Sequence, residues 1–200
     1  MENLNVTISK GNSKMGLIYS VSVPPVITCR KDAPCQKGCY ALKGSFLFPN
    51  VINSYKHNLE LFLEHPMDFE LSILKQLPMY GVFRWQVAGD IVNLEYFEMM
   101  IRIAKKLKNV KFLAFTKKYE LVNDYIANGG KIPNNLKIVY SAWNGLEVIN
   151  PTKFPVAYVR DEKNLDPNIP KTALPCSGDC SQCLVCWGLR KRQSVVFHKH

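Results

Sequence analysis

The sequence predicts an α/β protein, built either as a partial (β/α) barrel or as an open, mostly parallel sheet of about five to six strands. Two observations lead to this class. Short apolar stretches rich in β-branched residues alternate with longer stretches of helical period, which is typical of parallel strands joined by helices. Chemically distinctive residues follow several of these strands, and such folds gather their sites at the carboxyl ends of strands. A cysteine-rich extension lies at the C-terminal end.

The first half of the chain is expected to begin with a strand over Leu17–Val23, in which apolar and small residues alternate before a pair of prolines. The loop Val26–Lys43 follows and contains three cysteines. Two helices are then expected, over Asn50–His65 and Asp68–Gln76, each followed by a proline. The first cysteines therefore lie directly after the first strand.

The second half of the chain alternates strand and helix. Strands are expected at Val82–Ala88, Lys111–Phe115, Leu136–Ala142 and Val156–Val159, and helices at Leu94–Leu107 and Lys118–Ala127. Asn93 suits the N-cap of the first of these helices, and Gly129 with Gly130 stops the second. We expect residues 1–165 to form the α/β core and residues 166–200 to form a metal-binding tail packed on it.

Composition indicates a soluble, cytoplasmic protein. Hydrophobic residues make up 47% and charged residues 21% of the 200 residues, which is ordinary globular composition. No apolar run approaches the roughly 20 residues of a membrane span, and the N-terminal segment lacks the apolar core of a secretory signal. In a reducing cytoplasm, clustered thiols are more often metal ligands or catalytic groups than disulfides.

The basic balance of the chain favours DNA or RNA as a partner. The net charge is +10 and the isoelectric point is near 9.3, which favours phosphate contacts. Two stretches concentrate the charge: Lys105, Lys106, Lys108, Lys111, Lys117 and Lys118, and then Arg190, Lys191 and Arg192. The alternative is a solvated surface without a partner. The oligomeric state is not readable from the sequence.

The first cysteine group contains Cys29, Cys35 and Cys39, spaced C-x5-C-x3-C. Thiolates are soft ligands that suit iron–sulfur clusters or zinc, and three of them leave one coordination position open. Closed structural sites normally have four protein ligands. Two alternatives stay open: three unrelated cysteines, or a zinc site completed by a cysteine from the second group.

The second group contains Cys176, Cys180, Cys183 and Cys186, spaced C-x3-C-x2-C-x2-C. A zinc ribbon separates its two cysteine pairs by a longer loop, whereas this spacing is close to that of ferredoxins read in the opposite order. It favours a 4Fe–4S cluster, with zinc or unliganded thiols as alternatives. Whether all four cysteines bind one cluster, or one of them binds elsewhere, stays open.

The first loop, with Tyr40 after its last cysteine, resembles the cluster loop of radical S-adenosylmethionine enzymes. The resemblance implies a 4Fe–4S cluster whose open iron binds S-adenosylmethionine. It also implies that Gly89 and Asp90 of the Ala-Gly-Asp segment contact that cofactor, with the acid on its amino group. The C-terminal extension resembles an auxiliary-cluster domain. The chain departs from the usual C-x3-C-x2-C spacing, and Ala-Gly-Asp stands in place of Gly-Gly-Glu.

A second resemblance covers nearly the whole chain. The order GNSK, CYALKG, AGD and CxxCxxCW is similar to a bacteriophage protein family named after mycobacteriophage gene product eighty-eight. This resemblance implies a phage or prophage origin, and hence the host cytoplasm as the location. It brings no established activity.

Polar residues at other strand ends complete the expected site. Ser141 and Asn144 suit a ribose or a carboxylate, although turn chemistry explains them equally well. Asp90 either contacts a cofactor amine or caps the following helix. The sequence therefore predicts an iron–sulfur enzyme of the radical type acting on a nucleic-acid-related substrate. The alternative is a non-enzymatic iron–sulfur or zinc protein that binds nucleic acid or a host protein.

Overall fold

A computed structural model describes residues 3–12, 15–162 and 166–198. Ser13 and Lys14 of the GNSK segment lie outside the described residues. The described residues form one open sheet in the order β1-β2-β3-β4-β5-β7-β6, and every pair of neighbouring strands is parallel. The strands are β1 (Tyr19–Val21), β2 (Gly81–Trp85), β3 (Val110–Thr116), β4 (Leu136–Ser141), β5 (Val156–Arg160), β6 (Leu174–Pro175) and β7 (Ser194–His198). The α/β prediction is confirmed, in its open-sheet form.

The helices also lie where the apolar periodicity predicts them. The longer ones are α1 (Pro49–Glu64), α2 (Pro66–Gln76), α3 (Leu94–Lys106) and α4 (Tyr119–Ala127). Three short 3-10 helices, η1 (Pro34–Gly38), η2 (Tyr40–Leu42) and η3 (Gly44–Leu47), fill the first cysteine loop. A proline opens both α1 and α2, and the Asn93 side chain accepts a hydrogen bond from the Tyr96 backbone N–H at the start of α3.

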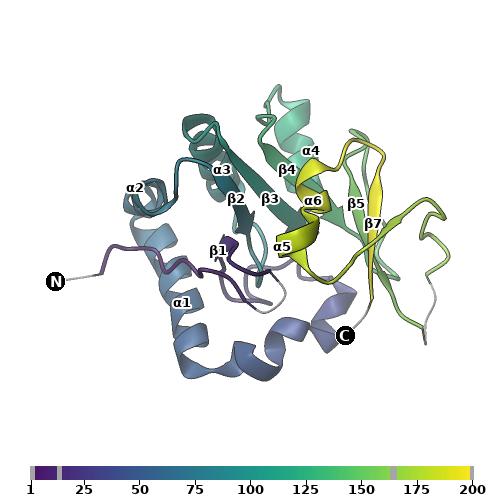
Figure 1. The fold of residues 1–200 in the computed structure, drawn as a ribbon, viewed down its shortest axis with the longest axis horizontal. Coiled ribbons are helices and arrows are strands. Elements are labelled where there is room, and N and C mark those ends of the chain that lie inside the picture. The colour runs from purple at the N-terminus through teal and green to yellow at the C-terminus, as the bar shows by residue number, and fades with distance from the viewer. Residues whose placement is uncertain (1–2, 13–14, 163–165, 199–200) are drawn as a thin grey trace.

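The main hydrophobic core lies on the face of the sheet that α1, α2 and α3 cover (Figure 1). Phe83 and Trp85 alternate along β2 with half-buried neighbours, and both are fully buried here. Phe112 lies opposite Phe83 on β3, and their rings pack edge to face with centroids 5.6 Å apart. Fully burying such a side chain contributes about 1.5–3 kcal/mol, so this face supplies most of the apolar stabilisation.

The C-terminal segment covers the opposite face of the sheet. Helices α5 (Cys180–Cys183) and α6 (Val185–Gly188) cross in front of the sheet in Figure 1, and α6 contacts β3 and β4. A second apolar cluster fills the space beneath them; it contains Met15, Ile18, Leu113, Val139, Ala157, Trp187, Leu189 and Val195. Trp187 donates a hydrogen bond from Nε1 to the Phe83 carbonyl oxygen, at 3.1 Å. This face is therefore sealed by residues distant in sequence from the strands beneath.

Two differences from the predicted elements have clear causes. The second expected strand ends at Trp85 rather than Ala88, because Gln86 has a φ of 44° and leaves the extended conformation. The predicted tail contributes β6 and β7 to the same sheet, with β7 paired to β5 on one side and β6 on the other.

None of the helices in the described residues has the length and apolar character needed to span a membrane.

Candidate metal centres and the sheet edge between them

The first cysteine loop leaves the carboxyl end of β1 and is tied down by charged side chains. The Arg30 guanidinium contacts Asp32 within the loop at 2.5 Å, and it donates to both carboxylate oxygens of Glu120 on α4 at 2.7 and 2.9 Å. Gln36 donates a hydrogen bond to the Arg30 carbonyl oxygen at 2.6 Å. Cys29, Cys35 and Cys39 are all partly buried in this loop.

Asp90 connects the loop to the ends of two strands. This residue is 5% exposed, and its carboxylate accepts hydrogen bonds from Thr116 Oγ1 (2.6 Å), the Ile91 N–H (2.7 Å) and the Lys117 N–H (2.9 Å). Its own N–H donates to Thr28 Oγ1 at 3.2 Å, next to Cys29. Burial raises the pKa of Asp90, although these hydrogen bonds and the Lys117 charge act to lower it. The carboxylate thus has a structural role at this edge.

Gly89 is required by close packing of the same loop. It has a φ of +81°, and a Cβ at this position would lie 2.5 Å from the Val23 carbonyl oxygen and 2.7 Å from Thr28 Oγ1. The residues expected to contact a cofactor, Gly89 and Asp90, are thus both engaged by protein groups. Cofactor binding by this pair stays a prediction.

The thiols of the first loop are close enough to influence one another electrostatically. Burial raises the pKa of Cys29 to about 11, and the charges of Asp90, Cys35 and Cys39 act in the same direction. Burial also raises the pKa of Cys35, while the Lys117 charge opposes the rise. The loop therefore favours neutral thiols, which would lose their protons on binding a metal cation.

Ser141 lies on the same edge, beside Lys117. Lys117 donates from Nζ to Ser141 Oγ at 2.7 Å, and the same atom lies 5.8 Å from the centre of the Trp143 ring. Tyr119 donates its hydroxyl to the Ser141 carbonyl oxygen at 2.6 Å. Asn144, half-buried, follows in the turn that Trp143 opens. The edge therefore combines a lysine, a hydroxyl and an aromatic ring, and the charge of the lysine, Lys117, acts on Cys35.

The second cysteine group occupies the connection from β6 to β7. Cys176 follows β6, Cys180 and Cys183 bound α5, and Cys186 lies in α6. Three of the four pack against the second apolar cluster, whereas Cys183 is exposed. Burial raises the pKa of Cys186 to about 12; the Cys176 and Cys180 thiols add to this, and the Arg84 charge acts against it.

The donor chemistry of both groups fits a soft metal, although the thiols do not converge. All seven cysteines are free of disulfides. In the part of the chain that the structure describes, no three His, Cys, Asp or Glu side chains are arranged to hold a metal ion. Thiolate-only donor sets suit iron–sulfur clusters and zinc. The fold therefore gathers each group, and metal binding requires side-chain rearrangement within each loop.

The sequence assigned no functional role of their own to two residues of this region, Arg84 and Tyr40. Arg84 projects from the middle of β2 beside the second cysteine group, and its signal in the sequence is a lone charge within the apolar run VFRWQVA. Tyr40 donates its hydroxyl to the Val87 carbonyl oxygen, and the charges of Arg84, Cys39 and Cys29 all act on its pKa, which burial raises. Tyr40 is therefore a residue of the first loop on which the Arg84 charge also acts.

The run of lysines expected to bind nucleic acid does not form one face. Lys105 and Lys108 are exposed near the amino end of β3, while Lys117 and Lys118 follow its carboxyl end. A strand of this length spans on the order of 20 Å. Lys106 is paired with Glu70 at 2.9 Å, and Lys118 donates to the Val92 carbonyl oxygen at 2.8 Å. The stretch thus divides into two separate sets.

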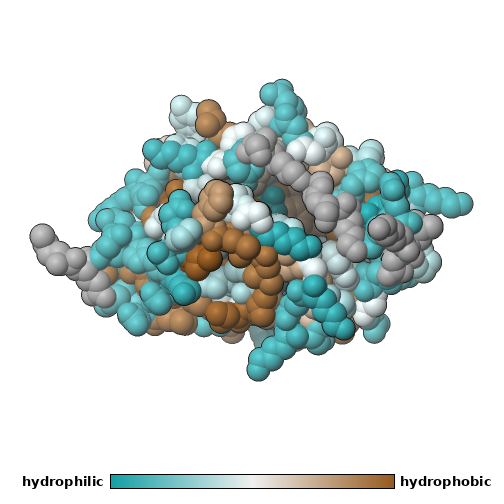
Figure 2. Space-filling model, turned by 90° about the horizontal axis from the view of Figure 1, so that it is seen from below, coloured by the Kyte–Doolittle hydropathy of each residue, from teal (hydrophilic) through white to brown (hydrophobic). Residues whose placement is uncertain are grey.

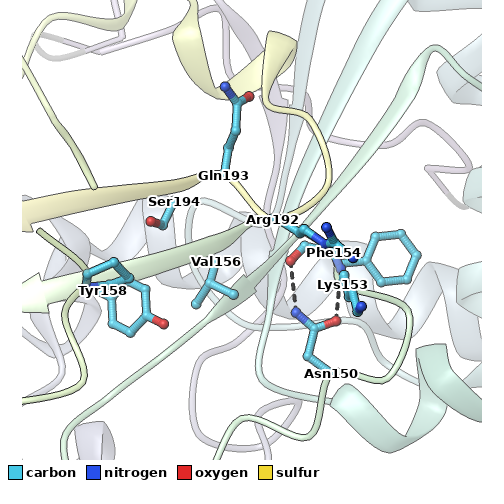
Figure 3. Close-up of a pocket in the computed structure, with 9 residues that line it drawn as sticks. Asn150, Lys153, Phe154, Val156, Tyr158, Arg192, Gln193 and Ser194 are labelled. Atoms are coloured by element: carbon cyan, nitrogen blue, oxygen red, sulfur yellow. Dashed lines mark hydrogen bonds between the residues drawn. The ribbon is translucent and has the colours of Figure 1, made fainter. Parts of the chain in front are cut away.

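A cavity of about 220 Å³ lies apart from these residues, beside β5 and β7 (Figure 3). Its lining includes Lys153, Tyr158 and Arg192, and no cysteine. The Asn150 side chain donates a hydrogen bond to the Phe154 carbonyl oxygen and accepts one from the Phe154 N–H, both at 2.8 Å. These contacts close a turn at the edge of the cavity.

Comparison with known proteins gives one match. The sequence model of a family described as gene product 88 matches residues 2–192. The match spans both cysteine groups and the sheet edge between them. No curated protein and no solved structure matches the chain.

Proposed function

The chain belongs to the gene product 88 family of phage proteins, and we propose that it is an iron–sulfur protein with two cluster sites. Cys29, Cys35 and Cys39 would hold a 4Fe–4S cluster with one open iron. The second group, residues 176–186, would hold an auxiliary cluster with four thiolates, for which zinc is the alternative. One observation carries this proposal: the chain has seven cysteines, all free of disulfides, and they fall into two groups.

The first site is proposed to be of the radical S-adenosylmethionine type. When bound, an open-iron cluster supplies an electron for reductive cleavage of S-adenosylmethionine. Lys117 and Ser141 offer a cation and a hydroxyl beside Cys35, and these groups suit the carboxylate of an amino-acid cofactor. Asp90 fixes the loop through Thr28 and keeps the thiols on the edge of the sheet.

Metal and sulfide analysis tests the cluster proposal. Anaerobically purified protein should contain iron and acid-labile sulfide. Replacing Cys29, Cys35 and Cys39 together with serine should remove the iron of the first site and leave the rest, and the matched replacement of the four C-terminal cysteines should do the reverse. Stoichiometric zinc without sulfide at both sites would overturn the iron–sulfur function.

A spectroscopic experiment tests the radical chemistry separately. Adding S-adenosylmethionine to the reduced protein should change the EPR spectrum of the first cluster and yield 5′-deoxyadenosine. The variant lacking the first three cysteines is the control and should show neither effect. An unchanged spectrum with clusters present, and no 5′-deoxyadenosine, would remove the enzyme and leave a binding protein.

We further propose a single-stranded nucleic acid as the substrate class. The face seen from below in Figure 2 carries an apolar area bordered by hydrophilic side chains. In and after the first cysteine loop, the rings of Tyr40 and Phe48 are 51% and 58% exposed, and Lys37 and Lys43 are exposed in the same stretch of sequence. Exposed rings with interspersed cations are typical of surfaces that stack bases and contact phosphates.

A salt titration against single-stranded DNA and RNA tests this substrate class. Replacing Lys37 and Lys43 with glutamate should weaken binding and reduce its salt dependence. The matched control replaces Lys105 and Lys108, which are exposed on the far end of β3. Equal losses from both pairs, or no binding at low salt, would exclude this loop as the interface.

The second candidate function is a non-enzymatic cluster or zinc protein that binds nucleic acid or a host protein. One observation favours it: Asp90 and Gly89 are already engaged by protein groups, so neither is free for a cofactor. This candidate predicts metal and nucleic-acid binding that are unaffected by S-adenosylmethionine.

A further inference from the structure

Arg84 places a positive charge on the tail-facing side of the sheet. Along β2, Phe83 and Trp85 point into the main core, so the alternation directs Arg84 to the opposite face. It lies opposite Ser20 on β1 and Leu113 on β3, in the second strand from the β1 edge of the sheet. Leu113 belongs to the apolar cluster beneath the second cysteine group.

In the described part of the chain, no carboxylate neutralises this charge. Arg84 Nη1 lies 3.6 Å from the Met15 sulfur, and the guanidinium carbon lies 5.0 Å from the centre of the Phe115 ring. Its Nε is buried and has no hydrogen-bond partner. Among the described residues, no Asp or Glu is within ion-pair distance of Arg84. Arg84 is half-buried, and partial burial of a cation without a counter-charge is unfavourable, so an anionic group should lie nearby in the functional protein.

The second cysteine group is a source of negative charge on the same face of the sheet. Met15 and Phe115, which hold the guanidinium, belong to the cluster against which Cys176, Cys180 and Cys186 pack. The turn at Met15 also touches α5, because a Cβ on Gly16 would lie 2.6 Å from Ser181 Cβ. Metal binding converts thiols to thiolates, so this cysteine group becomes anionic when it holds a metal.

We infer that Arg84 is the counter-cation of the C-terminal metal site: it neutralises the metal-bound thiolates and donates its unused Nε–H to one of their sulfurs. The inference rests on the proposed function, because it requires a metal at Cys176, Cys180, Cys183 and Cys186. It holds for either metal, since a four-thiolate zinc site and a four-thiolate iron–sulfur cluster both carry net negative charge. With a cluster, Arg84 also favours the reduced state, which carries one more negative charge.

The test compares Arg84→Met with Arg84→Lys, which keeps the charge, and with Arg190→Met, which removes an exposed charge from the same segment. Metal release to a chelator should be about 10- to 100-fold faster in Arg84→Met, the usual range for lost partners of metal ligands. It should change little in Arg84→Lys and Arg190→Met. If the site holds a cluster, its midpoint potential should become more negative in Arg84→Met alone.

The metal-free protein supplies a readout that a purely structural role would not give. Without metal, Arg84→Met should unfold at the same or a higher urea concentration than the parent, because it removes an uncompensated, half-buried charge. Lower stability without metal, or unchanged release with metal retained at the four cysteines, would overturn the inference while leaving the proposed function intact. A parent protein without metal at these four cysteines overturns both.

Discussion

The two cysteine groups are held by different forces. The first loop is fixed by polar contacts, with Asp90 linking Thr28, Thr116 and the Lys117 backbone. The second lies over an apolar cluster, held by buried Trp187 and by the pairing of β7 with β5. Polar contacts at a sheet edge can be exchanged for contacts to a ligand, whereas a packed cluster cannot open without unfolding. The difference suits the first group to a reactive site and the second to a permanent one.

The largest expected effect comes from Trp187. Truncating it to alanine should lower the free energy of unfolding by about 3–5 kcal/mol, because the ring is 7% exposed and the change leaves a cavity. Urea denaturation measures the loss, and metal analysis should show that the second site empties while the first is retained. Trp187→Phe, which keeps most of the ring, is the control and should lose less. Equal loss of metal from both sites would contradict the separation of the two groups.

Asp90→Asn should affect the first group alone. The amide has one oxygen for three donors, so the Lys117 N–H or the Asn side chain is left unpaired, at a cost of about 1–3 kcal/mol.

The pH dependence of this variant gives a further check. The pKa of Asp90 is raised above its ordinary value of 3.8 in the folded protein. The folded state therefore holds this proton more tightly, and the resulting stability is present below that ordinary value and lost as the pH rises through the raised one. Urea denaturation from acid to neutral pH should show this decline in the parent and not in Asp90→Asn. Identical pH profiles would contradict the raised pKa.

Thiol alkylation of the metal-free protein compares the two groups directly. Thiolates are the reacting species, so Cys29 and Cys186, with pKa values raised to about 11 and about 12, should react at least about tenfold slower at neutral pH than in the unfolded chain. Exposed Cys183 should be labelled first. Mass spectrometry of peptides gives the order, and raising the pH should speed both slow residues. Early labelling of Cys186 would show that the second group is not packed as described.

The smallest effect is expected at the ion pair between Arg30 and Glu120. Both side chains are partly exposed, at 22% and 48%, so Arg30→Ala should cost only about 0.2–1 kcal/mol. Its consequence should be local: faster proteolytic cleavage within residues 26–48, and unchanged labelling of Cys186. A change at Cys186 as large as that in the loop would mean that the two groups are coupled.

Local sequence signals predicted most of the fold. The strand expected at 136–142 and the helix expected at 94–107 agree with β4 and α3 to within one residue each. They agree because the spacing of apolar residues, the capping by Asn93 and the flanking glycines are all local signals. β7 was not predicted, since its partner β5 is separated from it by the whole cysteine segment. A short apolar run beside basic residues carries no local sign of such pairing.

The candidate site was predictable by residue type but not by contact. The cysteines, Asp90 and Ser141 stand out chemically, and the sheet brings Asp90 and Ser141 to one edge with the first loop. The donors that occupy the Asp90 carboxylate come from residues up to 27 positions away, which no local pattern reveals. The sequence did not single out Arg84, because a lone charge within a strand usually faces solvent. The packing of α5 and α6 on this face of the sheet is what places Arg84 by the second cysteine group.

The position of β7 between β5 and β6 has a consequence for biosynthesis. During translation β6 emerges first and finds no neighbour, because the strand that pairs with it is made later. The four cysteines between the two strands are therefore exposed on the nascent chain and enclosed only when β7 inserts. The first loop differs, since β1 and β2 are adjacent in the sheet and are both made early. The two groups are thus enclosed at different times, and under the proposed function the second would have to receive its metal before or during the insertion of β7.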